Sequence, residues 1–131
     1  MEHRKVNPWD WQNQFAFSQA IEVAGGSRVL YCAGQTSVDE HGSPLHVGDM
    51  RKQVERAFQN LETVLKASGF ALSDVTRLNY YTTDVDKFFE AHDVVKNRLS
   101  QAGCQPSGTL LGIARLAFPG LMIEIEATAV K

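Results

Sequence analysis

The sequence predicts an α+β two-layer sandwich in which two helices cover one face of a mixed sheet of four to six strands. Apolar residues recur at helical spacing in two long segments, 49–69 and 84–103. Apolar runs typical of strands lie before, between and after these segments. The chain has 131 residues, of which 44% are hydrophobic and 21% charged. This length and composition fit a single globular domain over residues 1–131.

The N-terminal part of the chain predicts a strand hairpin preceded by an irregular segment. Trp9 and Trp11 stand among polar residues, so this segment is expected to pack onto the domain through the two rings. A peripheral binding surface is the alternative. Strands are expected over residues 15–23 and 28–35, with a Gly-Gly-Ser turn between them. The two strands are therefore expected to pair with each other.

Two helices and a strand follow. The first helix begins at Asp49, whose side chain suits an N-cap, and ends at a glycine. Its apolar stripe comprises Met50, Val54, Ala57, Phe58, Leu61, Val64 and Leu65. A strand is expected over residues 75–82. The second helix begins at Asp84 or Asp86 and continues to about residue 102.

The C-terminal residues predict a second hairpin. A Pro-Gly pair separates two apolar runs, 108–116 and 121–130, and both residue types favour a turn. Alternate side chains of the last strand point to opposite faces, so one face is apolar and the other carries Glu124 and Glu126. That second face either meets water or is covered. A covered carboxylate must be paired, protonated or functional.

Composition and motif spacing narrow the classes of function. The net charge of −2, with both signs mixed, offers no basic surface for nucleic acid or an anionic membrane. No stretch has the length and apolar character of a signal peptide or a membrane-spanning helix, so we expect a cytoplasmic protein. Cys32 and Cys104 lie far apart and are expected to be reduced thiols. The histidines lack metal-binding spacing, and neither a metal nor a cofactor is expected.

The number of helices has a consequence for assembly. Two helices can cover only one face of the expected sheet. The other face, which carries Glu124, has no covering element in the chain. An apolar sheet face left open is normally closed against copies of the same protein, so the sequence predicts a homo-oligomer.

Several segments together resemble the RidA/YjgF family of small trimeric proteins. They are IEIEATAV with the preceding GIARL, together with FSQAI, CAGQTS, GSP, LKASGF and LSDVTRLNYYTTDVDKF, in matching order. The resemblance extends from about Phe15 to Val130. It implies a chorismate mutase-like fold and a homotrimer with a central barrel. It also implies clefts for a small-molecule ligand between neighbouring subunits.

The resemblance also implies an activity. Well-characterised members hydrolyse reactive enamines and imines to keto acids and ammonia. In those proteins an arginine holds the substrate carboxylate, and a glutamate in the last strand positions water or the imine nitrogen. The glutamate corresponds to Glu124, whereas the position of the arginine is Gly108. A family tyrosine, serine and asparagine are also replaced, and the substrate-contacting positions expected here are Phe17, Ala33, Gly34, His92, Gly108 and Leu110.

The missing arginine changes the expected chemistry. An α-imino acid would lose two charged hydrogen bonds, each worth roughly 1.5–3 kcal/mol. Arg115 lies seven residues after Gly108, so an unbroken strand would point its side chain to the opposite face. We therefore do not expect Arg115 to replace the arginine. Without a cationic partner, Glu124 is expected to have a raised pKa and to suit acid or base catalysis.

The sequence thus predicts a trimeric member of this superfamily that binds a small molecule other than the usual α-imino acid. If the protein is an enzyme, the expected reaction is deamination or hydrolysis assisted by Glu124. One alternative is a non-catalytic ligand-binding or regulatory protein. A weaker alternative is a ribonuclease, which the absence of a basic surface disfavours. Cys104 is expected to be an ordinary loop thiol rather than a nucleophile.

Overall fold

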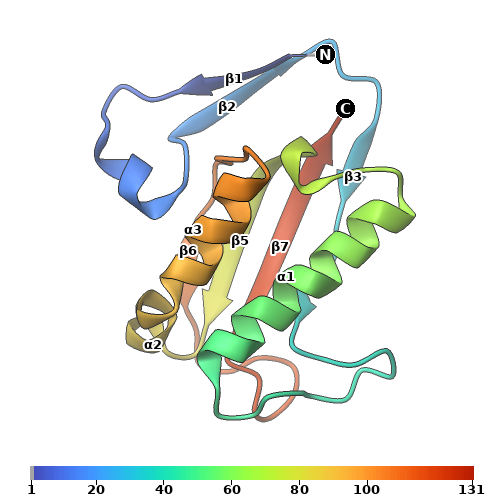
Figure 1. Ribbon diagram of the computed structural model, residues 1–131, viewed down its shortest axis with the longest axis vertical. Coiled ribbons are helices and arrows are strands. Elements are labelled where there is room, and N and C mark those ends of the chain that lie inside the picture. Colours follow the sequence, from blue (N-terminus) through green and yellow to red (C-terminus); the bar gives the residue numbers. More distant parts are fainter. Residues whose placement is uncertain (1) are drawn as a thin grey trace.

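The computed structural model describes residues 2–131 and shows helices packed on one face of a mixed sheet (Figure 1). The sheet order is β3 (Val29–Tyr31), β7 (Ile123–Val130), β5 (Val75–Thr82) and β6 (Leu110–Gly112), and β4 (Gln35–Thr36) pairs with the other end of β7. Only β5 and β6 are parallel; the other pairs are antiparallel. The predicted α+β sandwich with a sheet of four to six strands is confirmed.

Helix α1 (Met50–Ala67) forms as its sequence pattern predicts. The Asp49 side chain caps it by accepting a hydrogen bond from the backbone N–H of Lys52 at 3.1 Å. Gly69 follows the helix with φ +77°, a conformation that glycine adopts without strain. The side chains that this helix buries against the sheet are Met50, Gln53, Val54, Ala57, Phe58, Leu61 and Leu65. This periodic stripe supplies much of the hydrophobic core.

The predicted second helix is broken into two, α2 (Val85–Glu90) and α3 (His92–Gln101). Asp84 caps α2 by accepting from the backbone N–H of Lys87. Ala91 interrupts the helix, because its φ of −101° and ψ of 7° lie outside the helical range. The break explains the irregular apolar stripe of this segment, since each short helix buries its own face.

The N-terminal hairpin prediction is wrong. Strand β2 (Ala20–Ala24) pairs with β1 (Glu2–Val6) in a separate two-stranded sheet, which projects beyond the end of the main sheet (Figure 1). The first part of the expected strand is instead the 3-10 helix η1 (Trp11–Phe15), which ends at Ala16 with φ +61°. Trp9 is 62% exposed, so the expected packing of this ring is also wrong.

The C-terminal pairing prediction is wrong as well. The turn forms, with Gly120 at φ +87°, but β5 lies between β6 and β7. Each of these strands pairs with β5, as Tyr80 lies opposite both Leu110 and Ile125. A favourable turn sequence reverses the chain, but it does not prevent a third strand from pairing between the two arms.

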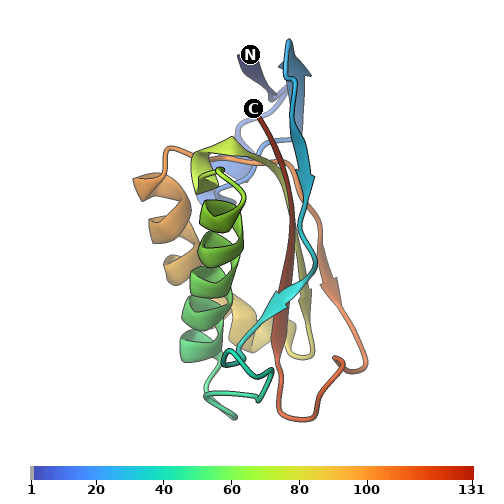
Figure 2. The ribbon, with the colours of Figure 1, turned by 90° about the vertical axis from the view of Figure 1, so that its right-hand side faces the viewer.

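The two faces of β7 differ as the alternating sequence predicts. Ile123, Ile125, Ala127 and Ala129 are buried under the helices. Glu124 and Glu126 lie on the opposite face, which no helix of the described residues covers (Figure 2). Within residues 2–131, no helix is both long and apolar enough to cross a membrane. Closure of the uncovered face against copies of the chain stays a prediction.

Candidate functional site

The structure divides the predicted site residues between two hollows on opposite faces of the sheet. The first is a cavity of about 260 Å³ on the helix side, whose lining includes Phe17, His92, Gly108 and Leu110. The second is a hollow of about 290 Å³ on the uncovered face, where Gly34 and Glu124 meet. Ala33 is exposed and lines neither. A single chain therefore does not bring all the predicted residues to one ligand.

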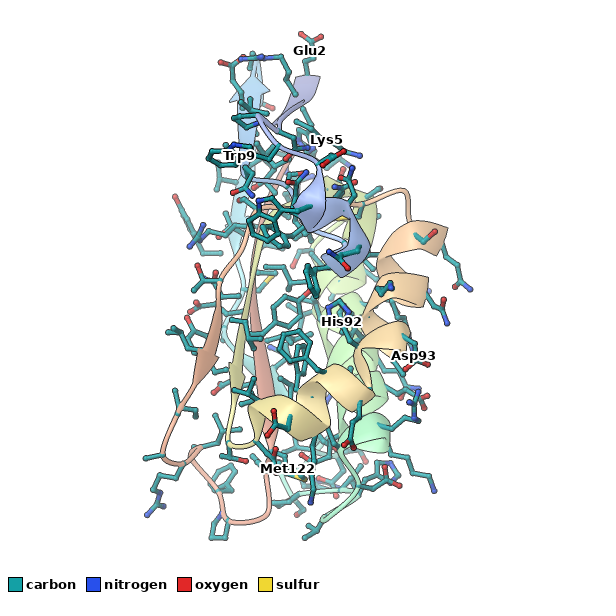
Figure 3. All side chains as sticks on the ribbon, turned by 90° about the vertical axis from the view of Figure 1, so that its left-hand side faces the viewer. Glu2, Lys5, Trp9, His92, Asp93 and Met122 are labelled. Carbon is teal, nitrogen blue, oxygen red and sulfur yellow. The ribbon has the colours of Figure 1, made fainter. Side chains whose placement is uncertain are left out.

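We call the first hollow the aromatic pocket. Its aromatic side chains are Trp11, Phe15, Phe17, Tyr80, Phe88 and Phe89, and His92, Gly108, Thr109 and Leu110 complete its lining. These residues come from η1 and the turn after it, from β5 and the β6 edge, and from α2 and α3. In Figure 3 His92 points from α3 towards the interior, whereas the adjacent Asp93 points outward.

The rings of the aromatic pocket support one another. The centroids of Trp11 and Phe17 are 5.7 Å apart, and those of Phe15 and Phe89 are 6.1 Å apart, both pairs in edge-to-face arrangements. Such pairs contribute about 0.5–1.5 kcal/mol each beyond the burial of their surface. Phe15 thus connects the N-terminal segment to α2. The pocket is largely formed before any ligand enters.

Besides Thr109, whose hydroxyl accepts a hydrogen bond from Arg77, two neutral polar side chains line this largely apolar pocket, Tyr80 and His92. Neither the Tyr80 hydroxyl nor the His92 ring forms a hydrogen bond within residues 2–131. In this range no fully buried side-chain nitrogen or oxygen lacks a partner. Both groups must therefore be accessible, and the pocket that they line gives that access. Burial raises the pKa of Tyr80 and lowers the pKa of His92, the latter helped by nearby Lys96, so both are uncharged at neutral pH.

Gly108 occupies a position with no room for a side chain. A Cβ atom built on it would collide with the backbone carbonyl oxygen of Leu78 on β5. The close approach follows from backbone pairing, since Leu78 donates its N–H to the carbonyl oxygen of Ser107 at 2.8 Å. In this backbone conformation, a longer residue at position 108 would require the strand edge to move.

We call the second hollow the acidic pocket. It is lined by Gly34, Tyr81, Ile113, Arg115, Leu116, Ala117, Glu124 and Glu126. The carboxylate of Glu124 lies directly against Gly34, where an added Cβ would collide with it. Burial, together with the neighbouring charge of Glu126, raises the pKa of Glu124. The raised pKa expected from the sequence is therefore supported by the structure.

Glu126 has the opposite electrostatic environment. It accepts hydrogen bonds from the Tyr81 hydroxyl at 2.8 Å and from the Asn79 side-chain amide at 3.2 Å. These two bonds lower the pKa of Glu126. The acidic pocket thus contains one carboxyl group that retains its proton more readily and one that is held ionised. Such a separation of pKa values is typical of acid–base chemistry.

The prediction that Arg115 points away from the face of Glu124 is wrong. It assumed a continuous strand after Gly108, but β6 ends at Gly112 and the chain then bends. Arg115 consequently lines the same hollow as Glu124. Its guanidinium forms no ion pair or hydrogen bond within residues 2–131, and it lies exposed at the edge of the pocket.

Five residues of the aromatic pocket were not predicted from the sequence as pocket residues: Trp11, Phe15, Tyr80, Phe88 and Phe89. For α2 and α3 a signal was present, because Phe88, Phe89 and His92 follow one another at helical spacing. For the N-terminal rings the only signal was the alternative of a peripheral binding surface around Trp11, because the segment reaches this pocket through long-range packing. Tyr81 and Arg115 were not predicted in the acidic pocket. Arg115 was excluded because the alternation of side chains along a strand was assumed to continue beyond Gly112, where β6 ends.

The remaining candidate groups do not form a site. Cys32 and Cys104 are buried and not disulfide-bonded. Burial raises the pKa of Cys104 to about 11, and its thiol donates to the carbonyl oxygen of Val75 at 3.5 Å. It is thus a poor nucleophile at neutral pH. Among residues 2–131, no three His, Cys, Asp or Glu side chains come together as metal ligands.

The fold and the two pockets define a class: small α+β proteins with ligand-sized hollows on both faces of one sheet. Residues 11–131 match the family model described as Endoribonuclease L-PSP. The RutC family protein YjgH of Escherichia coli is 34% identical over 129 residues, which cover 98% of this chain and 95% of that one. This chain therefore belongs to the RidA/YjgF family.

Other relatives agree with this assignment. The 2-iminobutanoate/2-iminopropanoate deaminase of Rattus norvegicus is 30% identical over 116 residues, covering 88% of this chain and 80% of that protein. The crystal structure of YyfB, a conserved Rid family protein of unknown function from Yersinia pestis, superposes with a TM-score of 0.87. The two share 31% identity, and the match covers 100% of both chains.

Proposed function

We propose that this protein binds a small metabolite and hydrolyses its enamine or imine group, with Glu124 as the acid–base residue. The observation that supports this most directly is the pair of carboxyl groups in the acidic pocket. Glu124 has a raised pKa, whereas hydrogen bonds from Tyr81 and Asn79 hold Glu126 ionised. Deaminases among the relatives make imine hydrolysis the reaction class to test first.

In the proposed reaction Glu124 transfers protons in both directions. Its carboxylate takes a proton from water as the water oxygen bonds to the carbon of a protonated imine, which gives a carbinolamine. The protonated Glu124 then donates to the amino nitrogen. The carbon–nitrogen bond breaks, the carbonyl forms, and the hydroxyl proton leaves through Glu124 with the departing ammonia. The protonated imine and water are thus converted into a carbonyl compound and ammonium.

We propose further that neighbouring copies of the chain complete the site. In one chain the sheet separates the aromatic pocket from the acidic pocket, because Tyr80 and Tyr81 point to opposite faces of β5. A homotrimer that buries the uncovered face could bring the acidic pocket of one subunit to the aromatic pocket of the next. The exposed apolar side chains of Val29, Tyr31 and Leu111 on this face support such burial.

The same geometry argues against efficient hydrolysis of 2-iminopropanoate. Gly108 provides no guanidinium, and its backbone leaves no room for one. Arg115 lines the acidic pocket together with Glu124, away from Gly108, and no ion pair or hydrogen bond joins the two within residues 2–131. An α-imino carboxylate would therefore have no paired cation at the position where the family resemblance places one.

Turnover assays test the proposal. The protein and a relative that carries the arginine should be compared on 2-iminopropanoate and on imines without a carboxylate. We expect activity on an uncharged imine that falls at least a hundredfold in Glu124→Gln, together with weak activity on 2-iminopropanoate. Turnover of 2-iminopropanoate within tenfold of the relative would contradict our view of Gly108, and loss of that turnover in Arg115→Ala would identify the replacement cation.

A non-catalytic ligand-binding protein is the second candidate. It is favoured by the aromatic pocket, which is preformed but, among residues 2–131, is lined by no charged or strongly nucleophilic side chain. This alternative predicts saturable binding with no release of ammonia from any imine. A mass in solution equal to one subunit would contradict the shared site in either case.

A further inference from the structure

The aromatic pocket has a chemical character of its own. No lysine, arginine, aspartate or glutamate in the described part of the chain lines it, and its histidine is held neutral by burial. We infer that the pocket selects ligands through a neutral, planar aromatic or heteroaromatic group that carries one hydrogen-bonding atom. This inference rests on the proposed function where it identifies that ligand as the substrate. The binding itself can be tested separately.

Size and shape support a ring-shaped ligand. An apolar cavity of about 150 Å³ is large enough to hold benzene. The volume of about 260 Å³ thus accommodates a substituted ring or a small bicyclic group. Trp11 and Phe17 meet at 72°, and Phe15 and Phe89 at 66°. These walls stand at steep angles to one another, so an inserted ring can make edge-to-face contacts with some and offset stacking with others.

The two polar groups define what the ring must carry. A purely apolar ligand would remove water from the Tyr80 hydroxyl and the His92 ring without replacing their hydrogen bonds, which is unfavourable. The Tyr80 hydroxyl can donate, and a neutral imidazole has one donor and one acceptor nitrogen. A carbonyl oxygen, an amide or a ring nitrogen on the ligand satisfies these groups.

Within residues 2–131 of one chain, the lining of the aromatic pocket offers a carboxylate no cation to pair with. A carboxylate moved from water into this pocket would lose hydration without gaining an ion pair. Lys96 is close enough to lower the pKa of His92, but it is exposed on α3 and does not line the pocket. Gly108, moreover, leaves room for neither a guanidinium nor any other side chain. The pocket therefore favours the uncharged member of a pair of ligands that share one ring.

Benzamide and benzoate provide such a pair of probes. The chain contains two tryptophans, and Trp9 does not line the pocket. In Trp9→Phe the remaining fluorescence comes from Trp11, whereas Trp11→Phe removes this reporter. With Trp9→Phe we expect saturable fluorescence changes on titration with benzamide and at least tenfold weaker binding of benzoate, both checked by calorimetry on the unmodified protein. Trp11→Phe should lose the fluorescence response.

Removal of one hydroxyl tests the polar contact. Tyr80→Phe should weaken benzamide binding about tenfold in calorimetry, because it removes the proposed donor. Thr63→Val is the control for loss of a hydroxyl: Thr63 is exposed on α1 and lines neither pocket, so this change should not affect binding. Circular dichroism and thermal melting should show that both variants are folded.

The possible outcomes separate this inference from the proposed hydrolysis. Equal or tighter binding of benzoate, no saturable binding of benzamide, or an affinity unchanged in Tyr80→Phe would each overturn it. If benzamide binds as described while no imine is hydrolysed, the inference stands and the proposed function fails. If an imine is hydrolysed but benzoate binds as tightly as benzamide or more tightly, the proposed function stands and the inference fails.

Discussion

The two pockets differ in chemistry although adjacent residues of one strand contribute to both. Tyr80 lies on the helix side of β5, among rings, and its hydroxyl has no partner in residues 2–131. Tyr81 lies on the other face and donates to Glu126 at 2.8 Å. The difference between them comes from the face of the sheet, not from the residue type. Adjacent residues of one strand can therefore line an apolar surface on one face of the sheet and a charged surface on the other.

The pockets also differ in what surrounds their glycines. Gly108 is packed against backbone, at Leu78, whereas Gly34 is packed against the flexible side chain of Glu124. Asn79 connects the two regions at the sheet edge: it accepts from the backbone N–H of Thr109 and donates to Glu126. The aromatic pocket is thus bounded by backbone at its glycine, whereas the acidic pocket is bounded there by a side chain.

The largest change in the free energy of unfolding is expected from Phe88, the buried ring that forms the floor of the aromatic pocket. Phe88 is 1% exposed and its ring contacts Tyr80, whereas Phe89 on the wall is 45% exposed. Phe88→Ala should lower the free energy of unfolding by roughly 3–5 kcal/mol, because it leaves a cavity in the core. Phe89→Ala should lower it by only about 1 kcal/mol. Urea denaturation of both variants measures the difference, and equal losses would show that the floor is not part of the core.

The glycines should respond differently to the same added methyl group. Gly108→Ala should lower the free energy of unfolding by about 1–3 kcal/mol, because β6 must move away from β5. Gly34→Ala should change it by less than about 1 kcal/mol, because only the Glu124 side chain must move. Turnover should nevertheless fall in Gly34→Ala. Thermal melts and kinetics on the two variants check this, and a stable Gly108→Ala protein would contradict the close packing.

The smallest changes in stability are expected from substitution of Glu124 and Glu126 by glutamine. The two substitutions should change the stability near pH 7 in opposite directions. The pKa of Glu124 is raised on folding, so its stabilising contribution is complete below the unfolded pKa of about 4.3 and is lost as pH rises through the folded pKa. Glu124→Gln should therefore be more stable than the unmodified protein near pH 7, by less than about 1 kcal/mol because the group is partly exposed. This advantage should vanish near pH 4.

Glu126→Gln is the matched comparison. The pKa of Glu126 is lowered on folding, so its contribution is present above the unfolded pKa and is lost as pH falls through the folded pKa. This variant should be slightly less stable near pH 7, and the loss should shrink at low pH. Melting temperatures from pH 3 to 8 test both variants, and parallel curves would contradict the opposite environments of the two groups.

Sequence patterns predicted several elements well because the responsible interactions are local. The cap at Asp49, the apolar stripe of α1 and the extent of β5 all appear as expected. The alternation in β7 correctly separated a buried face from the face with Glu124. The division of the second helix at Ala91 was missed, since its cause is a backbone conformation with no distinctive residue.

The site was harder to predict than the elements. Glu124 and its raised pKa were anticipated, but the other expected residues proved to lie in two hollows. Arg115 was not expected on the face of Glu124, because side chains alternate along a continuous strand. It nevertheless lines the acidic pocket, because β6 ends at Gly112. Most rings of the aromatic pocket were not foreseen, since Trp11 and Phe15 reach it from a segment expected to be irregular or a strand.

The amino-acid sequence by itself determined the helices, the strand faces, the glycine at position 108 and membership of a family. Periodicity, capping and turn chemistry depend on neighbours a few residues away, so they can be recognised in the chain alone. Only the tertiary structure decided that β5 pairs between β6 and β7, that β2 joins β1, and that the N-terminal rings contact α2. These pairings join residues far apart in the chain, and local preferences do not distinguish among the available partners.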